Sequence, residues 1–427
     1  MKKVQKTKER NFLKIFLAIV FGLFIVSFIT LVGLCIDYHY IQFENVQTDT
    51  YTLNSVNELR KDDYLTVVGD KIFNEKGNTV VLQGVNLGGW LLQEYWMCPV
   101  KGNEEIDQWT NLETLDVLEK RFGEQKTQEL VQTYEDNWIT EWDIENIASL
   151  GCNVVRVPFW YRNFMKNPTG DWINDDLNMN PGFQRLDWII DTAGKYGLYV
   201  ILDMHGCPGG QSEDHCAGSA RRSELFTVPE YQDAMEKLWV AIAERYQGNP
   251  VVAAYDIMNE AQAPTESIGS DPRNSVYDRM YKAIRKVDPE HIIIMEGIWD
   301  LSVLPIPETM GWTNVMYEVH PYGVSDTEAE CQRYVEYSQA YHVPIYIGEF
   351  SDPSWYENCR KHGLHFTSWT YKGDQYMDEP WFMYYADKML AADVYHDPYW
   401  LIKLKWGKCL NTRYFVENQN VRQLWIQ

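Results

Sequence analysis

Eight short apolar runs alternate with helix-like stretches along the chain, and this alternation restricts the possible fold more than any other feature. The runs lie at residues 80–87, 154–160, 199–204, 252–258, 291–296, 315–319, 344–347 and 365–371. Between most of them, apolar residues recur at helical spacing, at residues 138–150, 183–196, 231–246, 275–287 and 327–341. Repeated strand–helix units predict parallel strands with right-handed crossovers. We therefore expect an α/β chain that closes into a (β/α)8 TIM barrel.

An open, doubly wound sheet is the alternative fold for such a pattern. That fold binds phosphate at a glycine-rich turn after its first strand, with the spacing G-x-G-x-x-G. Residues 84–89 (GVNLGG) lack this spacing, which favours the barrel. Upstream, residues 65–82 contain β-branched runs broken by turn residues. They predict an N-terminal β-hairpin that closes one end of the barrel.

The first forty residues differ in character from the rest of the chain. Residues 15–36 carry no charge, and as a helix they are long enough to cross about 30 Å of hydrocarbon. Residues 1–14 contain six basic residues, which favours a cytoplasmic N-terminus. We expect a cytoplasmic tail (1–14), a single transmembrane helix (15–36), a stalk (37–64) and a catalytic barrel (65–427) outside the plasma membrane. A cleaved signal peptide is the alternative, but no small-residue cleavage site is evident after Ile36.

Charge and cysteine content restrict the partners and the covalent chemistry. Outside residues 1–14 the chain carries 32 basic and 60 acidic residues, which argues against nucleic acid as a partner. Eight cysteines fit disulfides in an exported domain, although Cys35 lies in the expected anchor and leaves an odd number. Cys207 and Cys216 are the candidate local pair. No clustered Cys/His spacing indicates a structural zinc site.

Polar residues follow the apolar runs, at the barrel end where functional side chains gather. Glu260 closes the fourth run (residues 255–260, YDIMNE) and Glu349 closes the seventh (residues 345–349, IYIGE). Two carboxylates across a barrel mouth suit glycosidic cleavage, because one protonates the leaving oxygen while the other supports the oxocarbenium-like centre. Their pKa values must differ. We expect Arg156 to keep Glu349 ionised, and burial beside a second carboxylate to keep Glu260 protonated.

Several separated motifs resemble glycoside hydrolase family 5, a retaining (β/α)8 family, and most nearly its exo-β-1,3-glucanase-like branch. The motifs are residues 84–94 (GVNLGGWLLQE), 153–158 (NVVRVP), 202–206 (LDMHG), 258–260 (MNE), 320–322 (HPY) and 348–349 (GE). Each motif alone is weak evidence for the family, but all of them in this order are specific for it. The resemblance covers about residues 65–375 and implies a retaining β-glycoside hydrolase of the β-glucanase or β-glucosidase type, without a cofactor or a metal.

The resemblance also implies a role for each matching residue. Glu260 would be the acid/base and Glu349 the nucleophile, with Asn259 bonding the sugar 2-hydroxyl. The supporting residues would be Arg156 and Tyr322 beside Glu349, His320 beside Glu260, and His205, Glu94 and Trp369 around the sugar of the −1 subsite. Trp369 would stack on the apolar face of the ring.

Two departures from the branch bear on specificity. Its pocket loop typically carries Asp-Asn where this chain has His215 and Cys216, and the proline that often follows Asn-Glu is here Ala261. Sugar and linkage preference therefore stay open among β-1,3-glucan, β-1,6-glucan, cellulose-like chains and glycolipid head groups.

Two other classes of function fit parts of the pattern. A non-catalytic carbohydrate-binding barrel would keep the aromatic residues but would usually lack one of the two carboxylates. A metal-dependent barrel hydrolase would need Asp203, His205, His215 and His320 to converge on one ion.

Overall fold

The structure is a computed structural model that describes residues 14–17, 19–27, 58–106, 108–263, 271–374, 381–386 and 391–426. The chain divides into two units, residues 1–49 and 50–427. Each unit is described by itself.

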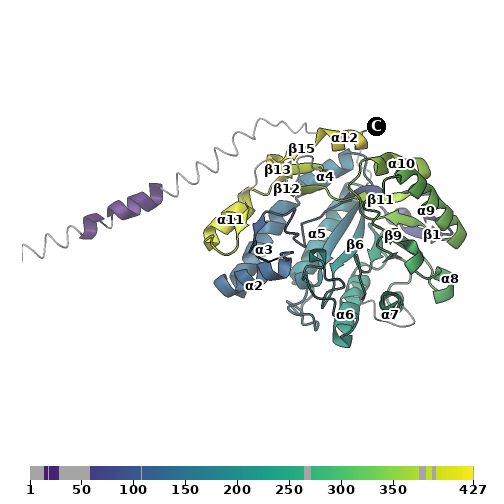
Figure 1. The fold of residues 1–427 in the computed structure, drawn as a ribbon, viewed down its shortest axis with the longest axis horizontal. Coiled ribbons are helices and arrows are strands. Elements are labelled where there is room, and N and C mark those ends of the chain that lie inside the picture. Colours follow the sequence, from purple (N-terminus) through teal and green to yellow (C-terminus); the bar gives the residue numbers. More distant parts are fainter. Residues whose placement is uncertain are drawn as a thin grey trace, which may run out of the picture. The chain divides into compact units, whose positions relative to one another are not determined.

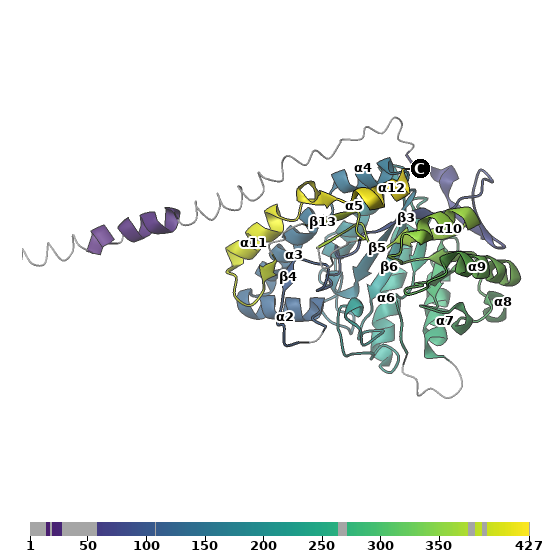
Figure 2. The same ribbon diagram turned by 45° about the horizontal axis from the view of Figure 1, so that its top comes forward.

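The second unit contains a closed barrel of eight parallel strands. Figures 1 and 2 show strands of this barrel with helices around them. Each strand lies at one of the eight predicted runs, so the barrel prediction is confirmed and the open sheet is excluded. In barrel order the strands are β3 (Gln83–Asn86), β5 (Val154–Trp160), β6 (Tyr199–Gly206), β7 (Val252–Asp256), β8 (Ile292–Glu296), β9 (Val315–Val319), β10 (Ile345–Ile347) and β11 (His365–Ser368).

The strand registers bring the carboxyl ends of the strands to one level. Asn86 pairs with Arg156, Asp203 with Asp256, and Glu296 with Glu318. The strand residues are almost all buried, because helices cover the outside of the barrel and side chains fill the inside. Polar side chains at these ends therefore lie in a dry environment and must find partners there.

Helices follow most strands, as the periodicity predicted. The longer helices are α2 (Asn111–Phe122), α3 (Glu124–Trp138), α4 (Glu141–Ser149), α5 (Pro181–Lys195), α6 (Pro229–Tyr246), α7 (Pro272–Arg285), α9 (Thr327–Tyr341) and α10 (Ser354–His362). The helix expected at residues 138–150 begins later than predicted. Thr140 and Asp143 form a capping box that starts α4, and Ile139 before it is extended.

The N-terminal hairpin covers the amino end of the barrel. Strands β1 (Leu65–Val68) and β2 (Lys71–Asn74) pair antiparallel. Leu65 and Ile72 pack in one cluster with residues of the barrel strands, among them Val154 and Tyr199. The backbone N–H of Val67 also donates to Asn314 Oδ1 at 2.7 Å, just before β9. The predicted closure by residues 65–82 is confirmed.

The segment after β11 completes the wall of the barrel on one side. Helix α11 (Tyr399–Lys408) packs against α3, and the views in Figures 1 and 2 agree on this. Strands β12 (Lys372–Asp374), β13 (Tyr384–Ala386) and β15 (Val416–Glu417) form a small sheet. Strand β14 (Ala392–Asp393) pairs with β4 (Val100–Lys101), and α12 (Gln419–Trp425) ends the described chain.

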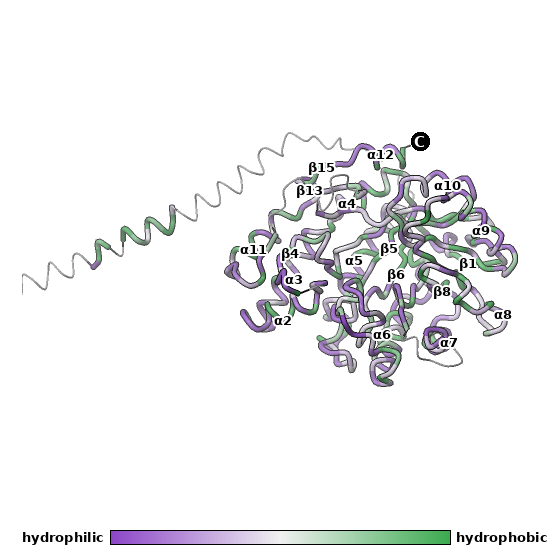
Figure 3. Tube along the Cα trace, in the orientation of Figure 1, coloured by the Kyte–Doolittle hydropathy of each residue, from purple (hydrophilic) through white to green (hydrophobic). Residues whose placement is uncertain are grey.

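The first unit is described only in part. Residues 14–17 and 19–27 are helical, and Figure 3 colours them as mostly hydrophobic. Their large apolar side chains are exposed; Phe24, for example, is 74% exposed. Within the described residues, no helix has both the length and the apolar character needed to span a membrane. The remainder of the predicted anchor, the tail before residue 14 and most of the stalk lie outside the described residues.

Candidate active site

Arg156 lies at the centre of the polar residues inside the barrel mouth. It is fully buried on β5, and its Nη1 lies 2.9 Å from Glu349 Oε1 and 3.2 Å from Asp203 Oδ2. Its Nη2 lies 2.8 Å from Asp256 Oδ2 and 2.9 Å from Asn259 Oδ1. The guanidinium thus connects β6, β7 and the residue after β10, which orients the side chains of all four partners.

Glu349 follows β10 and is 4% exposed. Tyr322 donates its hydroxyl to Glu349 Oε2 at 3.0 Å, so each carboxylate oxygen has one fixed donor. The preceding residue has to be glycine, because a Cβ on Gly348 would lie 1.5 Å from Glu318 Oε1. The Asn86 side chain donates to the carbonyl of Gly348 at 2.8 Å and holds this backbone in place.

Glu260 follows β7 and contacts three elements. Its Oε1 lies 2.9 Å from His320 Nδ1, and its Oε2 accepts from the thiol of Cys216 at 3.5 Å. Its backbone N–H donates to Glu296 Oε2 at 2.5 Å. Glu260 has φ +42°, a left-handed conformation that costs free energy in a non-glycine residue. The surrounding contacts stabilise this conformation and direct the side chain toward His320.

His320 also connects the two proposed catalytic carboxylates. The same Nδ1 that lies 2.9 Å from Glu260 Oε1 lies 3.7 Å from Glu349 Oε2. Its Nε2 lies 3.1 Å from Glu318 Oε1, which fixes the ring orientation. The two catalytic candidates therefore face each other across one imidazole.

The charges in this cluster differ from the prediction. Burial raises the pKa of Glu260, but the hydrogen bond and charge of His320 outweigh burial and lower this pKa to about 2. Burial lowers the pKa of His320, but Glu296, Glu349, Glu260 and Glu318 raise it well above its usual value. A proton between these two groups therefore favours His320, contrary to the expectation that burial keeps Glu260 protonated.

Burial and Arg156 act on Glu349 in opposite directions. Burial raises its pKa, against the attraction of His320 and Arg156. Arg156 therefore compensates only part of the desolvation that Glu349 undergoes at the end of β10. Of the two catalytic candidates, Glu349 is the weaker acid, and Arg156 acts in the predicted direction by favouring its ionised form.

The sugar-binding candidates are also brought together. His205 Nδ1 lies 2.7 Å from Asp203 Oδ2, and its ring stacks on Trp369 with centroids 5.3 Å apart and planes 8° apart. Asn259 Nδ2 lies 3.4 Å from His205 Nε2. Because Asn259 Oδ1 already accepts from Arg156, its amide NH2 is left as the group that can bond a ligand.

Glu94 belongs to the same site through the loop after β6. His215 Nε2 lies 2.9 Å from Glu94 Oε2, and Trp96 Nε1 donates to this oxygen at 2.9 Å. Burial raises the pKa of Glu94, but the hydrogen bond and charge of His215 lower it below its usual value. His215 and its neighbour Cys216 thus contact Glu94 and Glu260 respectively, which places this loop over both carboxylates.

The predicted Cys207–Cys216 disulfide is wrong, since both cysteines are free and buried. Cys216 directs its sulfur toward Glu260, and Cys207 directs its sulfur toward the carbonyl of Met204, 3.9 Å away. The two thiols of the loop after β6 therefore make separate contacts.

Sequence reasoning missed two buried carboxylates, Asp256 and Glu318. Each pairs with Arg156 from inside the barrel. Burial raises the pKa of Asp256 well above its usual value, with Glu318 adding to the rise against the attraction of Arg156. Alternation along a strand could have found Glu318, because it lies two residues before His320 and so faces the same way.

The site contains a group of acidic and histidine side chains with the spacing of metal ligands. Among the described residues, the ligand atoms of Glu260, Glu296 and His320 lie within 4.8 Å of one another. The set Asp203, His205, His215 and His320, on which the metal-hydrolase alternative depended, does not form such a group within the described chain.

Solved structures with a similar fold include an endogalactoceramidase, with a TM-score of 0.54 and 19% identity over 73% of this chain and 76% of that one. A rutinosidase from Aspergillus niger has a TM-score of 0.52 and 16% identity, over 69% of this chain and 90% of that one. At these identities the likeness concerns the fold alone.

Curated relatives include a beta-xylosidase from Phanerodontia chrysosporium, 32% identical over 64% of this chain and 54% of the relative. A protein named probable glucan 1,3-beta-glucosidase A from Neosartorya fischeri is 29% identical over 50% of this chain and 49% of its own length. This chain spans about half the length of these relatives. The family described as Cellulase (glycosyl hydrolase family 5) matches residues 101–375. The chain belongs to glycosyl hydrolase family 5.

Proposed function

We propose that the chain is a retaining β-glycoside hydrolase of the β-glucanase or β-glucosidase type, with Glu349 as the nucleophile and Glu260 as the acid/base. The observation that carries the proposal is the position of His320 Nδ1, 2.9 Å from Glu260 and 3.7 Å from Glu349. Two carboxylates that contact one imidazole lie close together, as the roughly 5–5.5 Å spacing of retaining enzymes requires.

Glu349 is suited to attack at the anomeric carbon. Arg156 and Tyr322 each bond one of its oxygens, so the carboxylate enters the reaction with a fixed orientation. The nucleophile forms a covalent glycosyl-enzyme and is later displaced by water.

Glu260 and His320 act together as the acid: His320 holds the proton, and Glu260 passes it to the leaving oxygen. The charge of Glu349 is among those that raise the pKa of His320. As Glu349 bonds to the anomeric carbon, that charge is neutralised and His320 becomes a stronger acid. In the same step its proton moves along the 2.9 Å hydrogen bond to Glu260, which protonates the leaving oxygen as the glycosidic bond breaks. In the second step Glu260 removes a proton from the attacking water.

The substrate proposed is a β-glucan or a related β-glycoside. The relatives named as a beta-xylosidase and a glucan 1,3-beta-glucosidase support this class. So do Trp369, which offers a stacking face, and Glu94, whose Oε1 can accept from a sugar hydroxyl while His215 and Trp96 occupy Oε2.

Membrane attachment is part of the same proposal. The uncharged run at residues 15–36 and the basic residues before it support a single-pass anchor in the plasma membrane, with the barrel outside. Protease added to intact cells should release the barrel and leave the anchor in the membrane fraction. Release of the barrel by a salt wash alone would contradict the anchor.

Product stereochemistry tests the proposed mechanism. Purified enzyme should be screened on β-glucans and aryl β-glycosides, and the first product formed should be observed by NMR. Retention of the β configuration is expected, and an inverted product would refute the double displacement. Glu349→Gly should abolish hydrolysis. Binding of glycans without any turnover would instead favour the non-catalytic alternative.

A further inference from the structure

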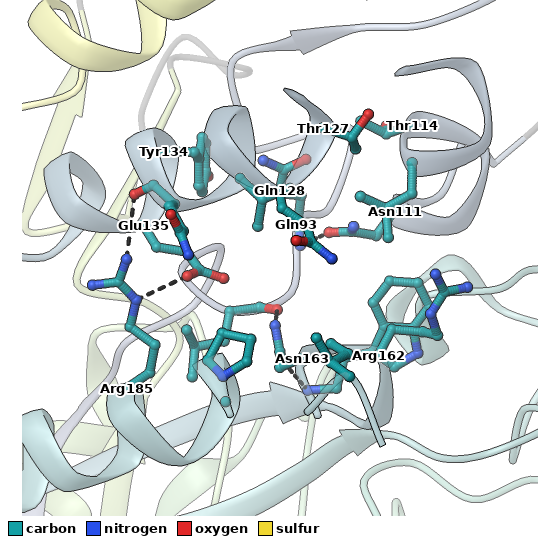
Figure 4. Close-up of a pocket in the computed structure, with 18 of the residues that line it drawn as sticks. Gln93, Asn111, Thr114, Thr127, Gln128, Tyr134, Glu135, Arg162, Asn163 and Arg185 are labelled. Carbon is teal, nitrogen blue, oxygen red and sulfur yellow. Dashed lines mark hydrogen bonds and ion pairs between the residues drawn. The ribbon is translucent and has the colours of Figure 1, made fainter. Parts of the chain in front are cut away.

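A cavity of about 300 Å³ lies between helices α2, α3 and α5 and the segment that follows β3, from which Trp90, Leu91 and Gln93 line it. Figure 4 shows side chains from its opposite walls, including Gln128 and Tyr134 on α3, and Arg162 and Asn163 on η2 (Tyr161–Asn163). None of the catalytic or sugar-binding candidates above lines it. Its volume is at the lower end of the roughly 300–1,000 Å³ range of ligand pockets.

The two arginines of the cavity wall are already paired with acidic side chains. Arg185 Nε lies 2.8 Å from Glu135 Oε2, as the dashed line in Figure 4 shows. Arg162 Nη2 lies 3.6 Å from Glu119 Oε1. A charged occupant would have to compete with these pairs.

Three lining residues carry buried N–H groups that have no hydrogen-bond partner in the structure. They are the indole Nε1 of Trp160, the indole Nε1 of Trp406 and the Nε of Arg162. Trp160 and Trp406 are each 1% exposed. An unpaired buried donor costs about 1–3 kcal/mol, and acceptor oxygens of an occupant could relieve this cost.

The lining also offers aromatic surface. Trp90 and Tyr134 line the cavity, and amide and hydroxyl side chains such as Gln93, Gln128 and Thr127 lie among them. A neutral molecule with apolar C–H faces and many acceptor oxygens matches this combination. Saccharides have these properties, because ring C–H groups stack on aromatic faces while hydroxyl and ether oxygens accept hydrogen bonds.

One wall of the cavity is formed by residues 90–93, which directly precede Glu94. Trp90 donates to the carbonyl of Glu135 at 2.9 Å, and Gln93 N–H donates to Asn111 Oδ1 at 2.6 Å. Both residues line the cavity, and the next residue, Glu94, bonds His215 in the catalytic site. An occupant that moves this wall would move Glu94 as well.

We propose that this cavity is a second saccharide-binding site, separate from the catalytic site, and that its occupant modulates sugar binding through Glu94. The proposal rests on the proposed function only for the choice of probe sugars. Binding is measured without turnover, so a failure of hydrolysis would leave the binding result intact.

The test is calorimetric titration of the full chain with Glu349→Gln, in a detergent without a sugar head group, using laminaribiose, cellobiose and xylobiose. Two sites are expected for at least one sugar. Val131→Trp, which fills the cavity from α3, should remove one site. Gln125→Trp, on the exposed side of the same helix, should keep both. A single site in the unfilled protein, or two sites in Val131→Trp, would overturn the proposal.

Trp406→Phe keeps the test decisive if the filled variant does not fold. It removes an unpaired N–H, so stability should stay the same or rise. Affinity at the second site should fall about five- to tenfold, the loss of one hydrogen bond. Unchanged affinity, or equally tight binding of an apolar alcohol without a sugar, would show that water or a non-sugar ligand fills the cavity and would overturn the proposal.

Discussion

At the scale of single residues, the site combines many buried acids with few bases. Arg156 contacts Asp203, Asp256, Glu318 and Glu349, all of them buried. One cation cannot compensate four ionised carboxylates in a dry environment. Burial therefore raises the pKa values of Asp203, Asp256 and Glu349, against the attraction of Arg156.

Arg156→Met should lower the free energy of unfolding by about 3–5 kcal/mol, because it leaves buried carboxylates without their counter-charge. Urea unfolding followed by tryptophan fluorescence measures the change. Arg156→Lys is the control: it keeps the charge but not the planar fork, so it should recover part of the stability and little of the activity. Wild-type stability in the Met variant would contradict the role given to Arg156.

His320→Asn should move the basic limb of the kcat/KM pH profile to lower pH. In the wild type the pair keeps its proton until pH passes the raised pKa of His320. Without His320 the proton is held by Glu260 alone, a carboxyl group whose ordinary pKa is about 4.3. Loss of activity without any shift of the basic limb would mean that His320 acts only in packing.

His320 and Glu260 also make the stability of the fold depend on pH. The pKa of His320 is raised in the folded state, so its contribution is fully present below the ordinary histidine pKa of about 6.5 and is lost as pH rises through the raised value. The pKa of Glu260 is lowered to about 2, so its contribution is present above about 4.3 and is lost as pH falls toward 2. Thermal unfolding measured across pH should show smaller losses of stability at both ends of the pH range in His320→Asn than in the wild type.

At the scale of elements, strands were predicted better than their connections. A strand buried on both faces appears as an apolar run in any context, so all eight strands could be located. The contacts between loops depend on residues far apart in the chain. The contact of Cys216 with Glu260 and the approach of His215 to Glu94 could therefore not be predicted, and a disulfide was expected in their place.

Ile72→Ala in the hairpin should destabilise the barrel by about 2–5 kcal/mol while KM stays unchanged, because Ile72 is fully buried at the end opposite the site. Thermal unfolding and steady-state kinetics on one aryl glycoside measure the two effects. Lys71→Ala, exposed on the same strand, is the matched control. A changed KM with unchanged stability would contradict the structural role of the hairpin.

At the scale of the whole molecule, the catalytic candidates could be predicted because a closed parallel barrel brings all its strand ends together. Glu260 and Glu349, 89 positions apart in sequence number, contact the same imidazole. Two whole-molecule features could not be predicted. They are the packing of α11 on α3, which rests on long-range contacts, and the location of the proton, which depends on every charge around His320.

The most direct test of the central claim is the configuration of the glycosyl azide formed when each catalytic carboxylate is removed and azide is added. With Glu260→Ala, azide should attack the covalent glycosyl-enzyme and give a β-glycosyl azide from an activated aryl β-glycoside. With Glu349→Ala, azide should occupy the space of the missing nucleophile and give the α-glycosyl azide. The opposite pair of configurations would reverse the two roles, and failure of azide to restore turnover in either variant would contradict the account.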